Sequence, residues 1–267
     1  MALLEARGLT VTYGGLNAND NVDLDCEIGK LVGLIGPNGA GKTTFIDAIT
    51  GFTPLSGGVC TFDGVDLAGK TPDARAHLGL SRTFQSLELF EDLSVRDNLL
   101  AAAERPRWHS FLTDIIRPGF NERPYREQVD WAMSIMGLDD MADTLPSDLS
   151  HGQRKLVGVA RALAAKPKLV LLDEPAAGLD TTESQLLGSH LREFLDQDIS
   201  VFLIDHDMGL VLNVCDYIYV LDFGQIIAHG TPAEIRSDPA VIAAYLGETA
   251  GEAQAQAGAS FGHTGDQ

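Results

Sequence analysis

The sequence predicts an α/β fold built on a mainly parallel sheet, and two patterns support this prediction. After residue 30, short apolar runs alternate with segments of helical period, which is typical of parallel strands connected by helices. Before that point, residues 3–13 and 22–28 alternate apolar and polar side chains, as half-buried antiparallel strands do. We therefore expect an antiparallel N-terminal part followed by a parallel core.

Several of the predicted elements have a local signal at their ends. A capping box of Ser94 and Asp97 begins one helix, and Gly137 ends another. Residues 14–21 are expected to form the turn between the first two strands. The further predicted strands span residues 31–35, 57–62, 80–84, 169–172, 200–204, 217–221 and 226–228, and the helices span residues 44–49, 72–77, 94–103, 128–136, 154–165, 181–195, 208–214, 231–237 and 239–246.

The composition favours a protein that folds in a reducing compartment. The chain has 267 residues and is 45% hydrophobic, enough for a sizeable core in one large or two small domains. Its cysteines, Cys26, Cys60 and Cys215, are scattered, which argues against a disulfide framework or a zinc site. We expect no signal peptide in residues 1–7, and no apolar run approaches the roughly eighteen residues that cross a bilayer.

Charge is distributed unevenly along the chain. The net charge of −19 repels nucleic acid and anionic lipid, so nucleic acid is not an expected partner and a membrane role needs another protein as anchor. In residues 104–126, however, arginines outnumber acids and aromatic residues are frequent. This insert is either an irregular surface excursion or a partner-contact surface. Residues 249–267 are rich in Gly, Ala and Gln, and we expect them to be disordered.

Residues 36–44 read Gly-Pro-Asn-Gly-Ala-Gly-Lys-Thr-Thr between a predicted strand and a predicted helix. Glycines at these positions let successive N–H groups point inward, and such a nest binds phosphate oxygens at a helix N-terminus. Lys42 can reach the β- and γ-phosphates, and the hydroxyl of Thr43 can bind Mg²⁺. The alternative is a glycine-rich turn with a chance lysine, which does not account for the G-x-x-x-x-G-K-[ST] spacing.

Polar groups follow three other predicted parallel strands, where ligands of α/β sheets bind. Asp173 and Glu174 end one apolar strand, where Asp173 can bind Mg²⁺ and Glu174 can polarise an attacking water. A capped helix start is the alternative for this pair. His206 follows another strand and can bond to a γ-phosphate, although a lone histidine is more often structural. Gln85 follows a third, where its amide can contact metal and water.

A second phosphate-binding element is predicted at residues 149–153, which read Leu-Ser-His-Gly-Gln. A serine hydroxyl, a glycine N–H and a helix N-terminus meet there. An ordinary serine N-cap is the alternative. Because the chain already has a phosphate loop, a second element indicates use in trans, with two chains arranged head to tail around two nucleotides.

Together these motifs resemble, in their order, the ATPase subunit of ABC transporters. The order is GPNGAGKTT at 36–44, LSHGQ at 149–153, LVLLDEP at 169–175, AGLD at 177–180 and then His206. The resemblance covers residues 3–246. It implies a P-loop NTPase of the ABC ATPase type over residues 1–248, with an N-terminal antiparallel β subdomain and a helical subdomain inserted at about residues 86–165. It also implies ATP and Mg²⁺ as the bound groups.

The resemblance assigns roles to individual residues. Tyr13, for which packing at a sheet edge is the alternative, would stack on adenine. Glu174 would be the general base, with Lys42, Gln85 and His206 as further catalytic residues. The residues assigned to nucleotide binding are Tyr13, Asn38, Gly39, Gly41, Lys42, Thr43, Thr44, Ser150, Gly152, Gln153 and the D-loop residue Asp180, and those assigned to metal binding are Thr43, Gln85 and Asp173.

Finer features resemble the LivG-type ATPase of branched-chain amino acid importers. They are Arg82-Thr83-Phe84-Gln85, the stretch at 89–99, the insert before Gln128, and Ala-Tyr-Leu-Gly at 244–247. His151 departs from the commonest form of the signature, which has glycine there. The tail after Gly247 lies outside the pattern.

The resemblance implies a subunit that hydrolyses ATP to power uptake of a small polar solute, a branched-chain or related amino acid. Its partners would be a second ABC ATPase subunit, transmembrane permease subunits and, indirectly, a solute-binding protein. The permeases would hold it at the cytoplasmic face of the bacterial plasma membrane. The alternatives are a urea or amide importer, a lipopolysaccharide-extracting ATPase, and a non-transport ABC ATPase acting on DNA or ribosomes. The LSHGQ segment disfavours a kinase or a GTPase.

Overall fold

The computed structural model describes residues 2–83, 89–103 and 123–245, in which two sheets are present. The antiparallel sheet has the order β2-β1-β4-β5, and the larger sheet has the order β10-β9-β3-β8-β7-β6. In the larger sheet all neighbours pair in parallel except β10, which is antiparallel to β9. The strands are β1 Ala2–Tyr13, β2 Leu16–Glu27, β3 Leu31–Ile35, β4 Gly57–Phe62, β5 Val65–Asp66, β6 Leu80–Arg82, β7 Leu169–Asp173, β8 Ser200–Ile204, β9 Tyr217–Asp222 and β10 Gln225–Gly230.

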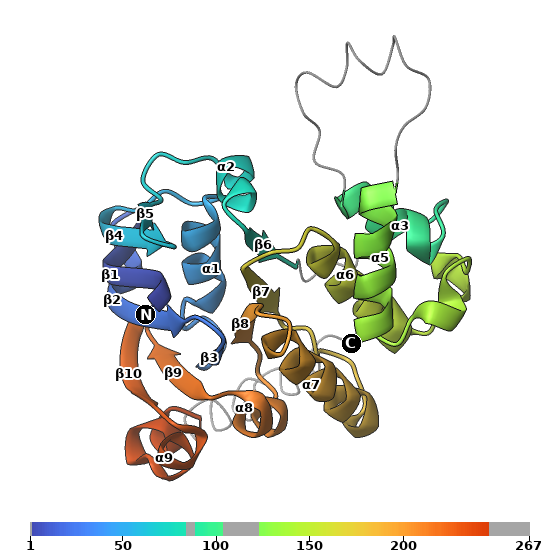
Figure 1. The fold of residues 1–267 in the computed structure, drawn as a ribbon. Coiled ribbons are helices and arrows are strands. Elements are labelled where there is room, and N and C mark those ends of the chain that lie inside the picture. The colour runs from blue at the N-terminus through green and yellow to red at the C-terminus, as the bar shows by residue number, and fades with distance from the viewer. Residues whose placement is uncertain (1, 84–88, 104–122, 246–267) are drawn as a thin grey trace, which may run out of the picture.

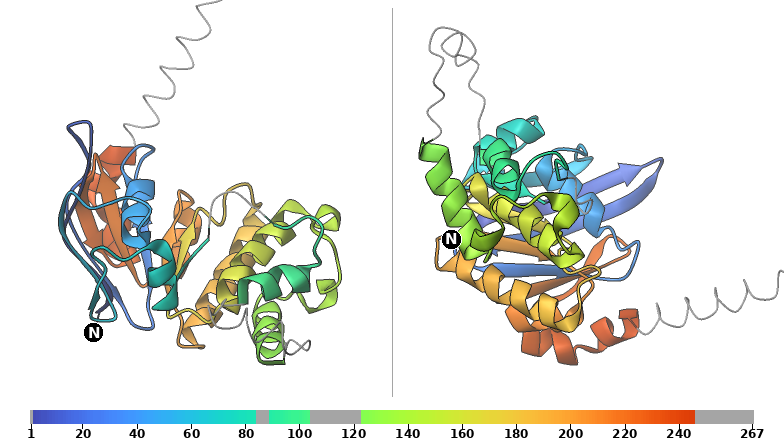
Figure 2. Two further views of the ribbon diagram at one scale, coloured as in Figure 1. Left: turned by 90° about the horizontal axis from the view of Figure 1, so that it is seen from above. Right: turned by 90° about the vertical axis from the view of Figure 1, so that its right-hand side faces the viewer.

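The helices lie on both sides of the parallel sheet, as Figures 1 and 2 show. α1 lies between the antiparallel sheet and one face of the parallel sheet, whereas α3, α5 and α6 form a separate group on the other side. The helices are α1 Lys42–Thr50, α2 Pro72–His77, α3 Val95–Ala103, α5 Arg123–Ile135, α6 His151–Ala164, α7 Thr181–Leu195, α8 Met208–Val214, α9 Pro232–Ser237 and a last helix over residues 239–245.

Two hydrophobic cores account for the continuous apolar runs of the central strands. Along β3, Val32 and Leu34 pack with Phe45 of α1, while Leu31 and Ile35 pack into the core that contains α6 and α7. Successive side chains of a strand point to opposite faces, so a strand covered on both faces must be apolar at every position. The same burial on both faces is seen in β7 and β8. The α/β class with its mainly parallel sheet is confirmed.

Several predicted boundaries are wrong. The turn between the first two strands is Gly14 and Gly15, which have φ values of +55° and +89°, and β2 already begins at Leu16. The polar residues after Leu16 suggested a turn, but β2 is an edge strand in which Asn17 and Asn21 are exposed, and the buried Asn19 donates to the main-chain oxygen of Gly41. α6 begins at His151 because Ser150 is its N-cap, and α5 begins at Arg123. A proline is tolerated in the first turn of a helix, which allows Pro124 there.

Some predictions fall on residues outside the described ranges. β6 ends at Arg82, and Gln85 lies among residues 84–88, which the structure does not describe. Most of the insert at 104–126 and the whole tail at 249–267 are likewise outside. Among the described helices, none is both long and apolar enough to cross a bilayer.

Candidate functional site

The carboxyl ends of three neighbouring strands bring the predicted groups together. β3, β8 and β7 are adjacent in the parallel sheet, with Leu34 opposite Ile204 and Ile204 opposite Asp173. The segments that follow these strands are the glycine loop, Asp205 with His206, and Glu174. The phosphate loop, the carboxylates and the histidine therefore meet at one edge of the sheet, where ligands of such sheets bind.

The backbone of the glycine loop requires its glycines. A Cβ on Gly36 would lie 1.9 Å from the main-chain oxygen of Leu221, and one on Gly41 would lie 2.3 Å from that of Ala18. Gly41 also has a φ of +105° and is the N-cap of α1. The first N–H groups of α1 are therefore presented at the loop, as a phosphate-binding helix N-terminus needs.

Lys42 is folded over the loop. Its side chain is buried, and Nζ donates hydrogen bonds to the main-chain oxygens of Gly36 at 2.6 Å and Pro37 at 2.9 Å. The ammonium charge thus lies within the curve of the loop, where phosphate oxygens can exchange with these carbonyls as acceptors. Asn38, Gly39 and Thr43 are exposed, and Thr44 is half-buried.

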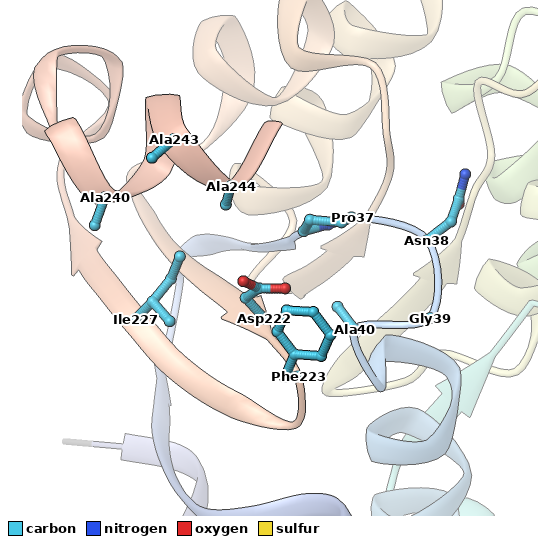
Figure 3. Close-up of a pocket in the computed structure, with 10 residues that line it drawn as sticks. All are labelled: Pro37, Asn38, Gly39, Ala40, Asp222, Phe223, Ile227, Ala240, Ala243 and Ala244. Carbon is cyan, nitrogen blue, oxygen red and sulfur yellow. The ribbon is translucent and has the colours of Figure 1, made fainter. Parts of the chain in front are cut away.

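Beside the loop lies an open groove of about 700 Å³, which Figure 3 shows. The ring of Phe223, on the turn between β9 and β10, is 88% exposed and lies next to Ala40. Because most of the lining is apolar and Asp222 adds a carboxylate, the groove does not extend the phosphate-binding surface. Its lining residues are Pro37, Asn38, Gly39, Ala40, Asp222, Phe223, Ile227, Ala240, Ala243 and Ala244.

Asp173 is held by an arginine that the sequence did not single out for a role. Arg82 Nη2 lies 2.9 Å from Asp173 Oδ2, and Nη1 lies 2.5 Å from Asp47 Oδ1 on α1. The side chains of Arg82 and Asp173 are almost fully buried. Burial raises the pKa of Asp173, and the Arg82 guanidinium offsets part of that rise. The arginine therefore connects the end of β6 to the end of β7 and to α1.

The oxygen donors at this edge fit Mg²⁺. That ion prefers oxygen ligands and is usually bound through one or two carboxylates plus substrate phosphates. Asp173 supplies a carboxylate and Thr43 supplies a hydroxyl next to the phosphate loop. In the described part of the chain no group of three His, Cys, Asp or Glu side chains could hold a metal ion by itself.

Glu174 has an unusual backbone conformation, with a φ of +49°. Its N–H donates to the main-chain oxygen of Ile204 at 2.7 Å, which ties it to the end of β8. His206 Nδ1 lies 4.0 Å from Glu174 Oε2, and the imidazole is 60% exposed. An acid and an imidazole thus lie close together at adjacent strand ends, and this arrangement can orient a water beside a phosphate.

Asp205 fixes the two loops that carry these groups. It is fully buried, and its carboxylate accepts from Ala176 N at 3.0 Å and from Asp207 N at 2.9 Å. Burial raises its pKa, and the two amide hydrogen bonds act against the rise. From the sequence alone no role was assigned to this aspartate, which precedes His206. Its position directly after an apolar strand was the available signal.

The N-terminal ends of α6 and α7 form a second cluster. Ser150 caps α6: its Oγ accepts from Gln153 N at 3.2 Å, and the Gln153 amide oxygen accepts from Ser150 N at 2.8 Å. Asp180 caps α7 in the same reciprocal way with Glu183. A Cβ on Gly152 would lie 2.4 Å from Glu183 Oε1, so the two helix starts are in close contact.

This second cluster differs in place and exposure from the sheet edge. α6 packs on the face of the parallel sheet opposite to α1. His151 is exposed, and its Nε2 would lie 3.2 Å from a Cβ on Gly178. Locally, Ser150 is thus an N-cap, as the alternative interpretation of the sequence expected. Ser150 and His151 are exposed, so a second molecule can reach this end of α6.

Tyr13 lies apart from this cluster, at the end of β1. It is 51% exposed, and its hydroxyl lies 3.1 Å from Thr53 Oγ1.

Comparison with known proteins identifies the class to which this architecture belongs. Residues 19–177 match the ABC transporter family. The chain is also similar to a solved structure, the ADP conformation of MJ1267, an ATP-binding cassette of an ABC transporter. The two share 32% identity over 93% of this chain and 100% of that chain, with a TM-score of 0.82. The chain belongs to the ABC transporter family and is an ATP-binding cassette ATPase, which confirms the predicted fold and enzyme class.

Within the family, residues 225–251 match the branched-chain amino acid ATP-binding cassette transporter family. The chain is 38% identical to the high-affinity branched-chain amino acid transport ATP-binding protein BraF of Pseudomonas aeruginosa and 37% identical to LivG of Escherichia coli, each over 92% of this chain and 98% of the relative. It is also 36% identical to the lipopolysaccharide export system ATP-binding protein LptB of Escherichia coli, over 93% of this chain and 98% of the relative. The predicted resemblance to the LivG type is confirmed.

Proposed function

We propose that this chain is the ATP-hydrolysing subunit of an importer for branched-chain or related amino acids. The match of residues 225–251 to the branched-chain amino acid family carries this proposal. Residues 19–177 match only the general ABC transporter family, whose members transport many different substances. Lipopolysaccharide export is the second candidate, since LptB is almost as similar over the same length. Import of urea or amides is a third, and a non-transport role is disfavoured by the net charge of −19.

At the sheet edge, the loop at 36–41 and the N-terminus of α1 bind the phosphates of ATP, and Lys42 turns its ammonium from the loop carbonyls to them. Thr43 and Asp173, with Gln85, would hold Mg²⁺, which neutralises charge that develops on the phosphates. Glu174 accepts the proton of the attacking water, and His206 donates a hydrogen bond to the γ-phosphate. Tyr13 offers its exposed ring to the adenine.

The second cluster completes the site of another chain. Ser150, Gly152 and Gln153 at the start of α6, with Asp180 at the start of α7, contact ATP that the loop of a second subunit holds. Support comes from the exposure of Ser150 and Asp180 and from the positions of α1 and α6 on opposite faces of the sheet. The second subunit is a copy of this chain or a related one. Two such sites enclose two ATP molecules in a head-to-tail dimer.

The partners at the membrane are permease subunits, which hold the protein at the cytoplasmic face of the bacterial plasma membrane. Docking is proposed at residues 85–93 and at the arginine-bearing insert at 104–126, and the structure describes only residues 89–93 and 123–126 of this proposed face. A solute-binding protein acts on the permeases and so indirectly on this chain. Crosslinks from that face to a permease would support the docking surface, and crosslinks only from the opposite face would contradict it.

A mixed dimer tests the proposed composite site. A Ser150→Arg chain is combined with a Lys42→Ala chain, so that one of the two sites keeps both an intact loop and an intact α6 start. ATP is expected to bridge these two chains, because the intact halves come from different subunits. The readout is ATP-dependent dimerisation by analytical ultracentrifugation, with each variant alone as control. Absence of bridging in the mixture would contradict use of α6 in trans.

Transport measurements separate the candidate cargoes. We expect deletion of the gene to abolish high-affinity uptake of labelled leucine, isoleucine or valine, and complementation with the wild-type chain to restore it. Complementation with the Glu174→Gln variant should fail, since uptake then lacks hydrolysis. If amino acid uptake is unchanged and lipopolysaccharide export is defective, the chain serves lipopolysaccharide export instead. If amino acid uptake is unchanged and urea uptake is lost, it serves urea import instead.

A further inference from the structure

A buried lysine joins the helix that begins at Ser150 to the strand end that carries Glu174. Lys155 lies in α6, its side chain is 9% exposed, and Nζ donates to the main-chain oxygen of Glu174 at 3.3 Å. Lysine is among the residues least often buried, because its charge loses hydration. Burial lowers the pKa of Lys155, while the nearby charges of Asp205 and Glu174 act in the opposite direction. The place of this ammonium is therefore not explained by apolar packing.

The acceptor belongs to a backbone segment under conformational constraint. With a φ of +49°, Glu174 lies in the left-handed region, which is unfavourable for a residue with a Cβ. Its carbonyl accepts from Ala177 N at 3.2 Å as well as from Lys155, and its N–H donates to Ile204 O at 2.7 Å. Because the backbone conformation sets the direction of the Cα–Cβ bond, these hydrogen bonds fix the point from which the Glu174 carboxylate extends.

We propose that Lys155 is a positioning residue for Glu174, through which α6 controls the direction of the Glu174 carboxylate. The inference rests on the proposed function, in which Glu174 acts on the attacking water and the start of α6 contacts ATP held by a second chain. A helix transmits a displacement of its first turn along its length. Contact between α6 and that ATP is therefore transmitted through Lys155 to the hydrolysis site of the same chain.

The charges around Lys155 favour this connection. Asp205, fully buried at the end of β8, places a carboxylate near the ammonium and is itself fixed by Ala176 N and Asp207 N. The Lys155 ammonium thus donates a hydrogen bond to the main-chain oxygen of Glu174 and attracts the carboxylate of Asp205. Glu174 follows β7 and Asp205 follows the neighbouring strand β8. A neutral side chain in place of Lys155 would loosen Glu174 without touching the phosphate loop.

The test measures hydrolysis and binding separately in the full-length chain. Lys155→Met keeps the length of the side chain but removes its charge and its N–H donors. We expect kcat to fall about tenfold to a hundredfold, as for a misplaced catalytic group, with the Kd for a fluorescent ATP analogue and the KM changed less than about threefold. Lys155→Arg, which keeps charge and donors, should recover part of the loss. Lys168→Met, at an exposed ion pair with Asp63, is the control and should keep kcat within about twofold.

A double-mutant cycle distinguishes positioning from a general structural role. If Lys155 acts through the Glu174 carboxylate, Lys155→Met should lower the single-turnover rate by less than about threefold when Glu174 is already Gln. The same fold-loss in both backgrounds would overturn the proposal, and so would an unchanged kcat in Lys155→Met. If Lys155→Met does not fold, Lys155→Gln takes its place, with the same expectations.

The same measurements keep this inference apart from the proposed function. A wild-type chain that hydrolyses ATP, is strongly slowed by Glu174→Gln and is unaffected by Lys155→Met would overturn the role of Lys155 alone. A Glu174→Gln chain that turns over at the wild-type rate would overturn the role of Glu174, and the role of Lys155 with it.

Discussion

The edge of the parallel sheet and the starts of α6 and α7 satisfy their polar groups in different ways. At the sheet edge, Asp173 and Asp205 are buried and are bound by groups from other segments, Arg82 and the amide of Ala176, while the amide of Asp207 in the same loop adds a bond to Asp205. At the helix starts, Ser150 and Asp180 are bound by residues of their own first turns. The sheet edge is thus organised by the whole fold, whereas each helix start is organised locally.

This contrast suggests how the two regions divide the work. Groups held from several directions stay in place without ligand, which suits residues that must be oriented for chemistry. Helix starts that are complete in themselves need nothing further from their own chain and remain accessible to a second one. Substitutions should therefore have their largest effects at the sheet edge and their smallest at the helix starts.

The largest effect is expected at Glu174. Glu174→Gln keeps the shape and removes the base, so kcat should fall by about 10²–10⁴, the usual range for loss of a general base. Binding of ATP should persist, and the dimer should accumulate with nucleotide trapped. Steady-state hydrolysis and size-exclusion chromatography with ATP measure the two. Glu193→Gln on α7 is the matched control, and near-wild-type turnover in Glu174→Gln would remove Glu174 from its role.

Arg82→Met should produce the largest loss of stability. It leaves the buried carboxylate of Asp173 without its cation, and breaking a buried pair in this way costs about 3–5 kcal/mol. The free energy of unfolding from urea titration measures the change. Arg7→Met breaks an exposed pair with Asp25 and should cost no more than about 1 kcal/mol. Equal losses in the two variants would show that the sheet edge does not depend on its buried pair.

Lys42→Ala should weaken ATP binding by roughly 10–100-fold, since hydrogen bonds to charged groups contribute about 1.5–3 kcal/mol. The fold should be retained, because the hydrogen bonds that Lys42 Nζ donates to Gly36 and Pro37 stay within its own loop. Equilibrium binding of a fluorescent ATP analogue is the measurement, and Lys168→Ala is the control. Wild-type affinity in Lys42→Ala would contradict the proposed phosphate site.

The smallest effect is expected at the start of α6. Ser150→Ala removes an N-cap and should lower the free energy of unfolding by about 0.5–2 kcal/mol. Thr71→Ala removes the equivalent cap of α2 and should cost a similar amount. ATP binding by the single chain should be unchanged in both, but only Ser150→Ala should weaken the ATP-dependent dimer. If both variants dimerise as the wild type does, Ser150 is a cap and nothing more.

Local signals predicted much of the fold and part of the site. The apolar runs identified β3, β7 and β8 because strands covered on both faces have no polar positions. The hairpin between β1 and β2 was misjudged, since the polar residues after Gly15 lie in an edge strand and resemble a turn in composition. Gln85 was predicted for the site but lies outside the described residues.

Three site residues had no function assigned from the sequence: Arg82, Lys155 and Asp205. Their partners are far away in the chain: Arg82 is separated from Asp47 by 35 positions and from Asp173 by 91. A single arginine, lysine or aspartate does not form part of a spaced motif that would identify it as a site residue. Residues of these three types are mostly exposed on protein surfaces. Burial against a specific partner distinguishes them, and of the three only Asp205, which directly follows an apolar strand, had a signal in the sequence.

The sequence by itself determined the parts of this protein whose chemistry is local. The glycines that a tight loop requires lie within a few residues of their lysine, and the two carboxylates after an apolar strand are adjacent in sequence, so each of these patterns is readable without a fold. Tertiary structure alone decided which strand ends meet, that Arg82 holds Asp173, and that Lys155 reaches the backbone of Glu174. These contacts depend on strand order and on helix packing, which bring together residues that no local pattern relates.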